Sequence, residues 1–133
     1  MITVWKSGTI NAPISRKENS IIERCINNNG APSITHYEVL KESDIDDFKY
    51  SILKCKLETG RTHQIRVHLA YISHPLLGDE LYGGNMDFIN RQALHSYKIS
   101  FFHPITNKKM HFEALMPNDL LKFYLNWEPS YLS

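Results

Sequence analysis

The segment that most constrains the fold is residues 48–58, FKYSILKCKLE, in which apolar and charged side chains alternate. For example, Lys54 stands between Leu53 and Cys55, and Lys56 follows Cys55. A period of two residues is that of a β-strand with one buried and one solvated face. Residues 34–42 alternate in a similar way, and the acidic linker at 43–47, SDIDD, suits a turn. These segments predict an antiparallel β-hairpin.

The rest of the chain contains shorter strand signals and two amphipathic segments. A short apolar run stands at residues 2–5, and NNNGAPS at 27–33 is dense in turn-forming residues. We predict two short strands at residues 8–14 and 21–26. A second hairpin is predicted at 97–104 and 108–115, and two helices are predicted at 63–72 and 118–127. This inventory predicts an α/β fold of the α+β kind, with an antiparallel-rich mixed sheet flanked by helices. The length of 133 residues fits a single domain, 1–133.

The first predicted helix, residues 63–72, has a recognisable start and a buried stripe. Thr62 precedes it and is a residue type that caps helix N-termini. Ile65, Leu69 and Ile72 are spaced i, i+4 and i+7, so we expect them to face the core. In the second helix, we expect Asn118 to be the cap.

Composition excludes several functional classes. The formal net charge is +1, which gives no bulk signal for binding nucleic acid or acidic membrane, so polyanion binding would need a local patch. Cys25 and Cys55 form no Cys-x-x-Cys pair, and we expect two reduced, buried thiols. Apolar runs are all shorter than the ~20 residues of a membrane span, and the N-terminus lacks a signal-like apolar core. We therefore expect a cytoplasmic protein that does not contact membranes.

Residues 60–82 concentrate arginines and histidines, a composition compatible with a metal site, a nucleophilic site or an anion site. His63 and His68 would lie about 140° apart around a helix, which does not suit a shared metal ion. A nucleophile elbow of the type Gly-x-Ser-x-Gly is missing from the sequence. Arg61 and Arg66 flank a predicted helix start, where free N–H groups favour anions. An enclosed guanidinium needs an anionic partner, whereas solvated arginines would need none, and spacing alone leaves both interpretations open.

Residues 60–84, GRTHQIRVHLAYISHPLLGDELYGG, resemble the signature of the RluA-type pseudouridine synthases. The segments GTINAPISR, PSITHYEVL, LKCKLETG, RQALHSYKISFFHP and a late MP turn resemble the same family in the same order. The resemblance covers residues 8 to about 126. It implies part of the pseudouridine synthase catalytic fold and an enzyme that isomerises uridine to pseudouridine in ribosomal or transfer RNA, without a cofactor or a metal.

The resemblance also implies roles for individual residues. Arg66 matches the arginine that pairs with the catalytic aspartate of the family. Leu94 matches an apolar position near the base. Tyr82 and His63 match motif residues near the cleft, where either could have a structural role instead. Arg61 is expected to meet a phosphate of the RNA.

The family's catalytic aspartate lies in a His-Arg-Leu-Asp-x-x-Thr-Ser-Gly-like segment, with a base-packing tyrosine some thirty residues later. In this sequence, none of the aspartates follows Arg-Leu or precedes Thr-Ser-Gly; they are Asp44, Asp46, Asp47, Asp79, Asp87 and Asp119. Asp79 falls in the Gly-Asp-x-x-Tyr-Gly turn, where the family's aspartate is not the nucleophile. The chain thus resembles the C-terminal half of the catalytic domain and is expected to be inactive alone.

Two consequences follow from this interpretation. Arg66 would lack its catalytic partner and would turn to solvent, recruit an anion, or pair with a glutamate or aspartate from a neighbour. The cut sheet would expose an edge, through which we expect self-association. The alternatives to a partial enzyme are a non-catalytic RNA-binding module and a remnant that a partner half would complete.

Overall fold

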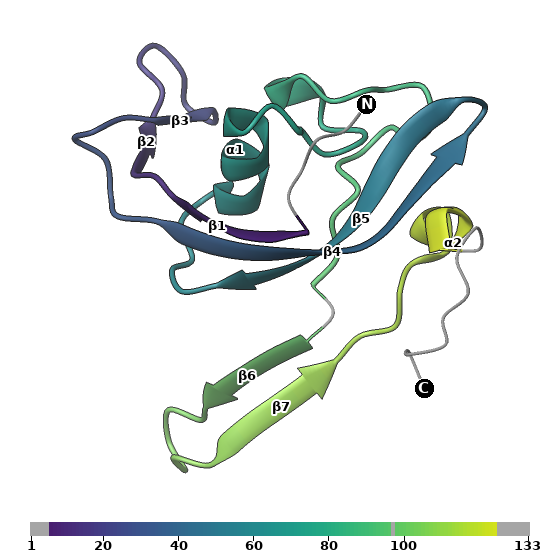
Figure 1. The fold of residues 1–133 in the computed structure, drawn as a ribbon. Coiled ribbons are helices and arrows are strands. Elements are labelled where there is room, and N and C mark those ends of the chain that lie inside the picture. The colour runs from purple at the N-terminus through teal and green to yellow at the C-terminus, as the bar shows by residue number, and fades with distance from the viewer. Residues whose placement is uncertain (1–5, 97, 125–133) are drawn as a thin grey trace. The chain divides into compact units, whose positions relative to one another are not determined.

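The computed structural model describes residues 6–96 and 98–124 and divides into two compact units, residues 1–92 and 93–133 (Figure 1). The first unit contains β1 (Ser7–Asn11), β2 (Ile14–Arg16), β3 (Arg24–Ile26), β4 (Ile34–Ile45), β5 (Phe48–Leu57), α1 (Gln64–Tyr71) and the single 3₁₀ turn η1 (Glu80–Tyr82). The second contains β6 (Lys98–Phe102), β7 (Lys109–Glu113) and α2 (Asn118–Tyr124). The mixed α+β class is confirmed, whereas the single domain stays a prediction.

The predicted long hairpin is confirmed as β4 and β5. The two strands are antiparallel, with Thr35 opposite Leu57 and Ile45 opposite Phe48. The turn is shorter than the predicted 43–47, because β4 continues to Ile45. Only Asp46 and Asp47 form it, with φ of 49° and 66°. A two-residue turn with positive φ at both residues has a backbone twist that matches the twist of the two antiparallel strands it connects.

β1 pairs with the other side of β4, so the sheet has the order β1-β4-β5. The predicted strand at 8–14 is therefore divided, because β1 ends at Asn11 and β2 begins at Ile14 in a separate two-stranded pair with β3. The predicted strand at 21–26 is shorter than expected and is limited to β3. The predicted self-association through an outer strand, β1 or β5, stays a prediction.

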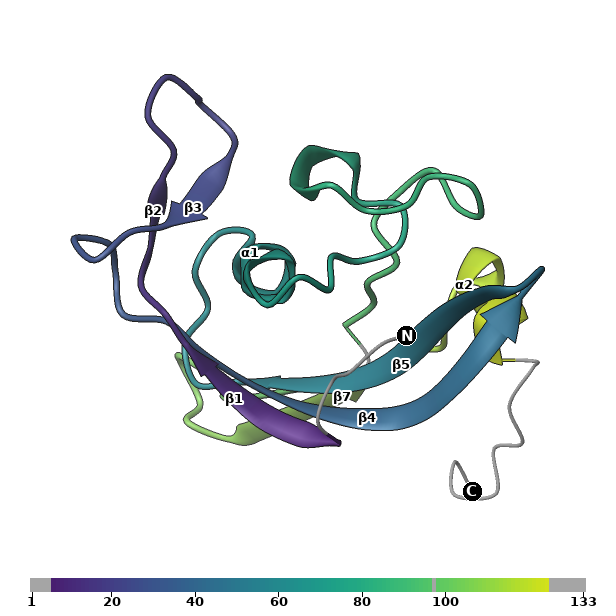
Figure 2. The ribbon, with the colours of Figure 1, turned by 45° about the horizontal axis from the view of Figure 1, so that its top comes forward.

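The core of the first unit lies between the sheet and α1, which Figure 2 shows almost end-on at the concave side of the sheet. Leu69 is 1% exposed and clusters with Ile10 and Ala12. Ile65 and Ile72 are half-buried and pack against this cluster, so the predicted stripe is confirmed most clearly at Leu69.

The same interface buries a polar network that the apolar pattern did not predict. His68 is 0% exposed, and its Nε2 donates to the Ala12 carbonyl at 2.9 Å. Its Nδ1 therefore accepts a hydrogen bond from the Thr35 hydroxyl, at 2.8 Å. Gln64 donates to the same hydroxyl oxygen at 3.0 Å. Burial lowers the pKa of His68, so the neutral imidazole is the form that this network holds.

The second unit is a hairpin followed by a helix. β6 and β7 are antiparallel, which confirms the second predicted hairpin. α2 begins at Asn118 itself, because Leu121 N–H donates to the Pro117 carbonyl at 3.2 Å. Asn118 is therefore the first helical residue and not the cap. The predicted apolar run at 2–5 and the end of the predicted helix at 125–127 lie outside the described residues.

The two cysteines, Cys25 and Cys55, are free and half-buried. Burial raises the pKa of the Cys55 thiol to about 11, so the thiol stays protonated near neutral pH. Within residues 6–96 and 98–124, the helices are all too short or too polar to span a membrane.

Candidate functional site

The start of α1 is built differently from the prediction. Thr62 is not the cap; His63 is, in the left-handed conformation with φ of 56°, and its side chain makes no capping hydrogen bond. The incoming loop is held instead by buried Gln64, whose Oε1 accepts from the Arg61 N–H at 3.0 Å and from the Thr59 hydroxyl at 2.8 Å. This arrangement turns the His63 side chain toward the loop that follows the helix.

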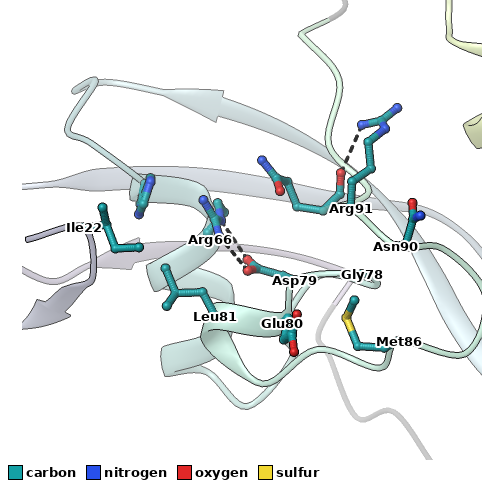
Figure 3. Close-up of a pocket in the computed structure, with 11 residues that line it drawn as sticks. Ile22, Arg66, Gly78, Asp79, Glu80, Leu81, Met86, Asn90 and Arg91 are labelled. Atoms are coloured by element: carbon teal, nitrogen blue, oxygen red, sulfur yellow. Dashed lines mark hydrogen bonds and ion pairs between the residues drawn. The ribbon is translucent and has the colours of Figure 1, made fainter. Parts of the chain in front are cut away.

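Arg66, one turn into α1, forms a two-hydrogen-bond ion pair with Asp79. Its Nε donates to Oδ2 at 2.9 Å and its Nη2 to Oδ1 at 2.8 Å (Figure 3). The Asp79 side chain is 0% exposed and that of Arg66 is 14% exposed. The carboxylate raises the pKa of Arg66, chiefly through these hydrogen bonds. The expectation that Arg66 turns to solvent is wrong. It pairs with an aspartate, and this aspartate comes from the same chain, because the Gly-Asp turn brings Asp79 to it.

The loop around Asp79 requires glycine at two places. Gly78 has φ of 75°, and a Cβ on it would overlap the carbonyl oxygen of Arg91. Gly84 donates its N–H to the Asp79 carbonyl at 2.7 Å, and a Cβ there would overlap the Leu76 carbonyl. Close backbone approach on both sides therefore fixes where the carboxylate stands.

Tyr82 joins three parts of this site. Its hydroxyl oxygen accepts from the Arg24 N–H at 2.9 Å and lies 2.8 Å from Nδ1 of His63. The Arg66 guanidinium carbon lies 5.0 Å from the centre of its ring, within range of a cation–π contact. Burial, then the charges of Arg66 and Arg24, lowers the pKa of His63, so its neutral ring accepts the Tyr82 proton. Burial raises the pKa of Tyr82, which keeps that proton in place.

The Tyr82→Phe variant is expected to lower the free energy of unfolding by about 0.5–1.5 kcal/mol, because the half-buried Arg24 N–H loses its acceptor. Urea denaturation would measure the change. The matched control is Tyr71→Phe on α1, since Tyr71 is 58% exposed. An equal effect of both changes would contradict a structural role for the Tyr82 hydroxyl.

An open pocket of about 430 Å³ lies beside the Arg66–Asp79 pair (Figure 3). Its wall combines cationic, amide and apolar side chains with the Gly-Asp turn. The lining residues are Ile22, His63, Arg66, Gly78, Asp79, Glu80, Leu81, Met86, Asn90, Arg91 and Gln92. Apolar walls with a few placed polar groups are the usual form of a small-molecule site.

The structure brings together only some of the residues singled out from the sequence. His63 and Arg66 line the pocket, and Tyr82 contacts both of them. Arg61 is exposed, and its Nε donates to the Pro32 carbonyl at 3.2 Å, outside the pocket wall. Leu94 is half-buried and belongs to the second unit, so its place near the base stays a prediction.

Sequence reasoning missed other pocket residues. The sequence places Asp79 only in a turn, and the 13 residues that separate it from Arg66 include the end of a helix and Gly78. Ile22 reaches the pocket from the β2–β3 connection, and Asn90 and Arg91 reach it from the last loop of the unit. Only the Gly-Asp pair offered a local signal, because a glycine marks a position where the backbone can adopt a positive φ or approach another segment closely.

Among the described residues, no group of three or more histidine, cysteine, aspartate or glutamate side chains is arranged to hold a metal ion. His63 and His68 illustrate the reason. His63 faces the pocket, while both ring nitrogens of His68 are engaged in the core.

Comparison with known proteins identifies the family. Residues 2–71, more than half of the chain, match the family model described as RNA pseudouridylate synthase. The chain is 49% identical over 115 residues to the uncharacterized RNA pseudouridine synthase YjbO of Bacillus subtilis, covering 86% of this chain and 39% of that relative. It is 38% identical over 128 residues to the ribosomal large subunit pseudouridine synthase D of Salmonella typhimurium, covering 86% of this chain and 38% of that relative.

A solved structure agrees with this result. The human RNA pseudouridylate synthase domain containing 1 superposes with a TM-score of 0.73 at 29% identity, covering 88% of this chain and 51% of that one. The chain thus spans less than two thirds of the relatives that it matches. The chain belongs to the RluA-type RNA pseudouridine synthase family.

Proposed function

We propose that this chain supplies the arginine-bearing half of the catalytic pocket of an enzyme that converts uridine to pseudouridine in RNA. The observation that carries the proposal is the fixed guanidinium of Arg66 on the wall of an open pocket, at the position that resembles the family's catalytic arginine. In the reaction, the bond from N1 of uracil to C1′ breaks and a bond from C5 to C1′ forms. The proton at C5 leaves, and N1 acquires one.

We further propose that the reacting carboxylate comes from outside the described part of this chain. Asp79 is fully buried and directs both oxygens at Arg66, so it is not available to a nucleoside. Glu80, the other acidic lining residue, is exposed and makes no ion pair with Arg66. A pocket without an accessible, oriented carboxylate lacks the group on which this chemistry depends.

Arg66 supports the reaction by binding that second carboxylate. Charge-assisted hydrogen bonds from a guanidinium favour the ionised form of a carboxylate and fix its orientation. His63 and Tyr82 hold the wall beside Arg66, and RNA is the expected partner. Two free cysteines fit a cytoplasmic location, since reducing conditions maintain thiols there.

Release of tritium from RNA labelled at C5 of uridine would test the proposal. The chain alone is expected to release none. A chimera in which the N-terminal part of YjbO precedes residue 2 is expected to release tritium. The Arg66→Lys chimera, which keeps a charge beside Asp79, is expected to lose this activity. The matched control is Lys54→Arg, since Lys54 is an exposed cation on β5, outside the pocket wall.

Three outcomes would decide against parts of the proposal. Release by the chain alone would show that its own residues suffice. A folded but inactive chimera, beside an active YjbO, would contradict the role of this half. Salt-sensitive RNA binding without turnover in the chimera would favour the non-catalytic binding module.

A further inference from the structure

Asp79 holds Arg66 by only one edge of the guanidinium group. The pair uses Nε and one N–H of Nη2, at 2.9 and 2.8 Å from the two carboxylate oxygens. A guanidinium has five N–H donors in one plane, so the edge formed by Nη1 and the second N–H of Nη2 remains. Within residues 6–96 and 98–124, Nη1 of Arg66 makes no hydrogen bond. The side chain lines the pocket and is 14% exposed, whereas the Asp79 side chain on its first edge is 0% exposed.

The groups that hold Arg66 are themselves rigid. The Asp79 N–H donates to the Leu76 carbonyl at 3.2 Å, and the Asp79 carbonyl accepts from Gly84 at 2.7 Å. The ring of Tyr82 lies 5.0 Å from the guanidinium carbon, and its hydroxyl is held by hydrogen bonds. A long side chain that would otherwise sample many rotamers is therefore restricted to one orientation.

We propose that Asp79 is a positioning residue, which orients Arg66 so that its second edge receives another oxyanion, a carboxylate or a phosphate, in the pocket. A role of that oxyanion in catalysis rests on the proposed function. Its binding at the second edge of Arg66 rests on the geometry alone. Because Asp79 cancels the charge of Arg66, the second anion is recognised by two directed N–H bonds more than by net charge. Planar or tetrahedral oxyanions are therefore preferred to chloride.

Nuclear magnetic resonance of the ¹⁵N-labelled chain would test this inference without RNA. Sodium acetate and inorganic phosphate are titrated separately, each replacing sodium chloride at constant ionic strength. In the wild type, the Nε–H signal of Arg66 is expected to be observable. At least one of the two oxyanions is expected to shift this signal. The Asp79→Asn variant is expected to bind that oxyanion about tenfold more weakly, as when one charge-assisted hydrogen bond is lost.

Asp87→Asn is the matched control for the lost negative charge. Asp87 lies in the same loop, is exposed, and accepts from the Asn85 side chain at 3.3 Å. It is not a lining residue of the pocket. Oxyanion binding in this variant is expected to equal that of the wild type.

The Arg66→Lys variant keeps the experiment decisive if Asp79→Asn does not fold. Lysine retains the charge and can pair with Asp79, but it lacks the second edge. Loss of oxyanion binding in a folded Arg66→Lys variant would support the inference, and binding equal to the wild type would overturn it. Equal binding by a folded Asp79→Asn variant, or no oxyanion binding by the wild type, would also overturn it. Binding of acetate alone or of phosphate alone would identify the preferred class, whatever the outcome of the tritium assay.

Discussion

The Arg66→Met variant is expected to unfold with a free energy about 3–5 kcal/mol lower than that of the wild type, because it leaves the Asp79 carboxylate buried without a counter-charge. The Asp79 side chain is 0% exposed, and both of its oxygens accept from Arg66. Small domains have only about 5–15 kcal/mol of total stability, so this loss would bring the variant close to unfolding. Urea denaturation followed by circular dichroism would measure it.

A double variant separates the ion pair from simple loss of contacts. Arg66→Met combined with Asp79→Leu removes both charges and is expected to be more stable than Arg66→Met alone, since no unpaired charge stays buried. The control is Lys17→Met, which removes one member of the Lys17–Glu23 ion pair. In this pair Nζ of Lys17 lies 2.7 Å from Oε2 of Glu23, and the Lys17 side chain is 56% exposed. This change is expected to have little effect. An equally small effect of Arg66→Met would contradict the importance of burial.

The central hairpin could be predicted because its signal is local. Alternation in 48–58 specifies a strand with two unlike faces, and the acidic linker before it specifies a turn. The exact turn could not be predicted, because Ser43 and Asp44 are compatible with either strand or turn. Pairing with Tyr50 and Lys49 places both in β4. Register across the sheet is thus decided by neighbours in space.

The polar residues of α1 show why the site was only partly predictable. A periodicity argument counts apolar residues, so it found Leu69 but not Gln64 or His68, whose burial depends on Thr35. The family resemblance drew attention to Arg66, but it assigned the guanidinium to a carboxylate elsewhere. The pair with Asp79 depends on a loop conformation that no single short segment specifies.

The His68→Leu variant is expected to lower the free energy of unfolding by about 2–4 kcal/mol at pH 7.5, because the Ala12 carbonyl and the Thr35 hydroxyl both lose a buried partner. Leucine is apolar and close in volume, so the loss would come from the hydrogen bonds more than from a cavity. A Thr35→Val variant, which removes the hydroxyl at the other end of the network, is expected to be destabilised in the same direction. A neutral His68→Leu variant would contradict the network's contribution.

The network also gives wild-type stability a defined dependence on pH. Because burial lowers the pKa of His68 below the ordinary 6.5, the unfolded chain binds a proton there before the folded chain does. Stability from this group is therefore complete above pH 6.5 and is lost as the pH falls from 6.5 through the folded-state pKa. Urea denaturation at pH 7.5 and at pH 5 is expected to show a decrease that is smaller in His68→Leu. The pKa of His63 is lowered as well, so a His63→Gln variant should retain the part of the decrease that belongs to His68. An unchanged pH dependence in His68→Leu would show that this imidazole does not titrate on unfolding.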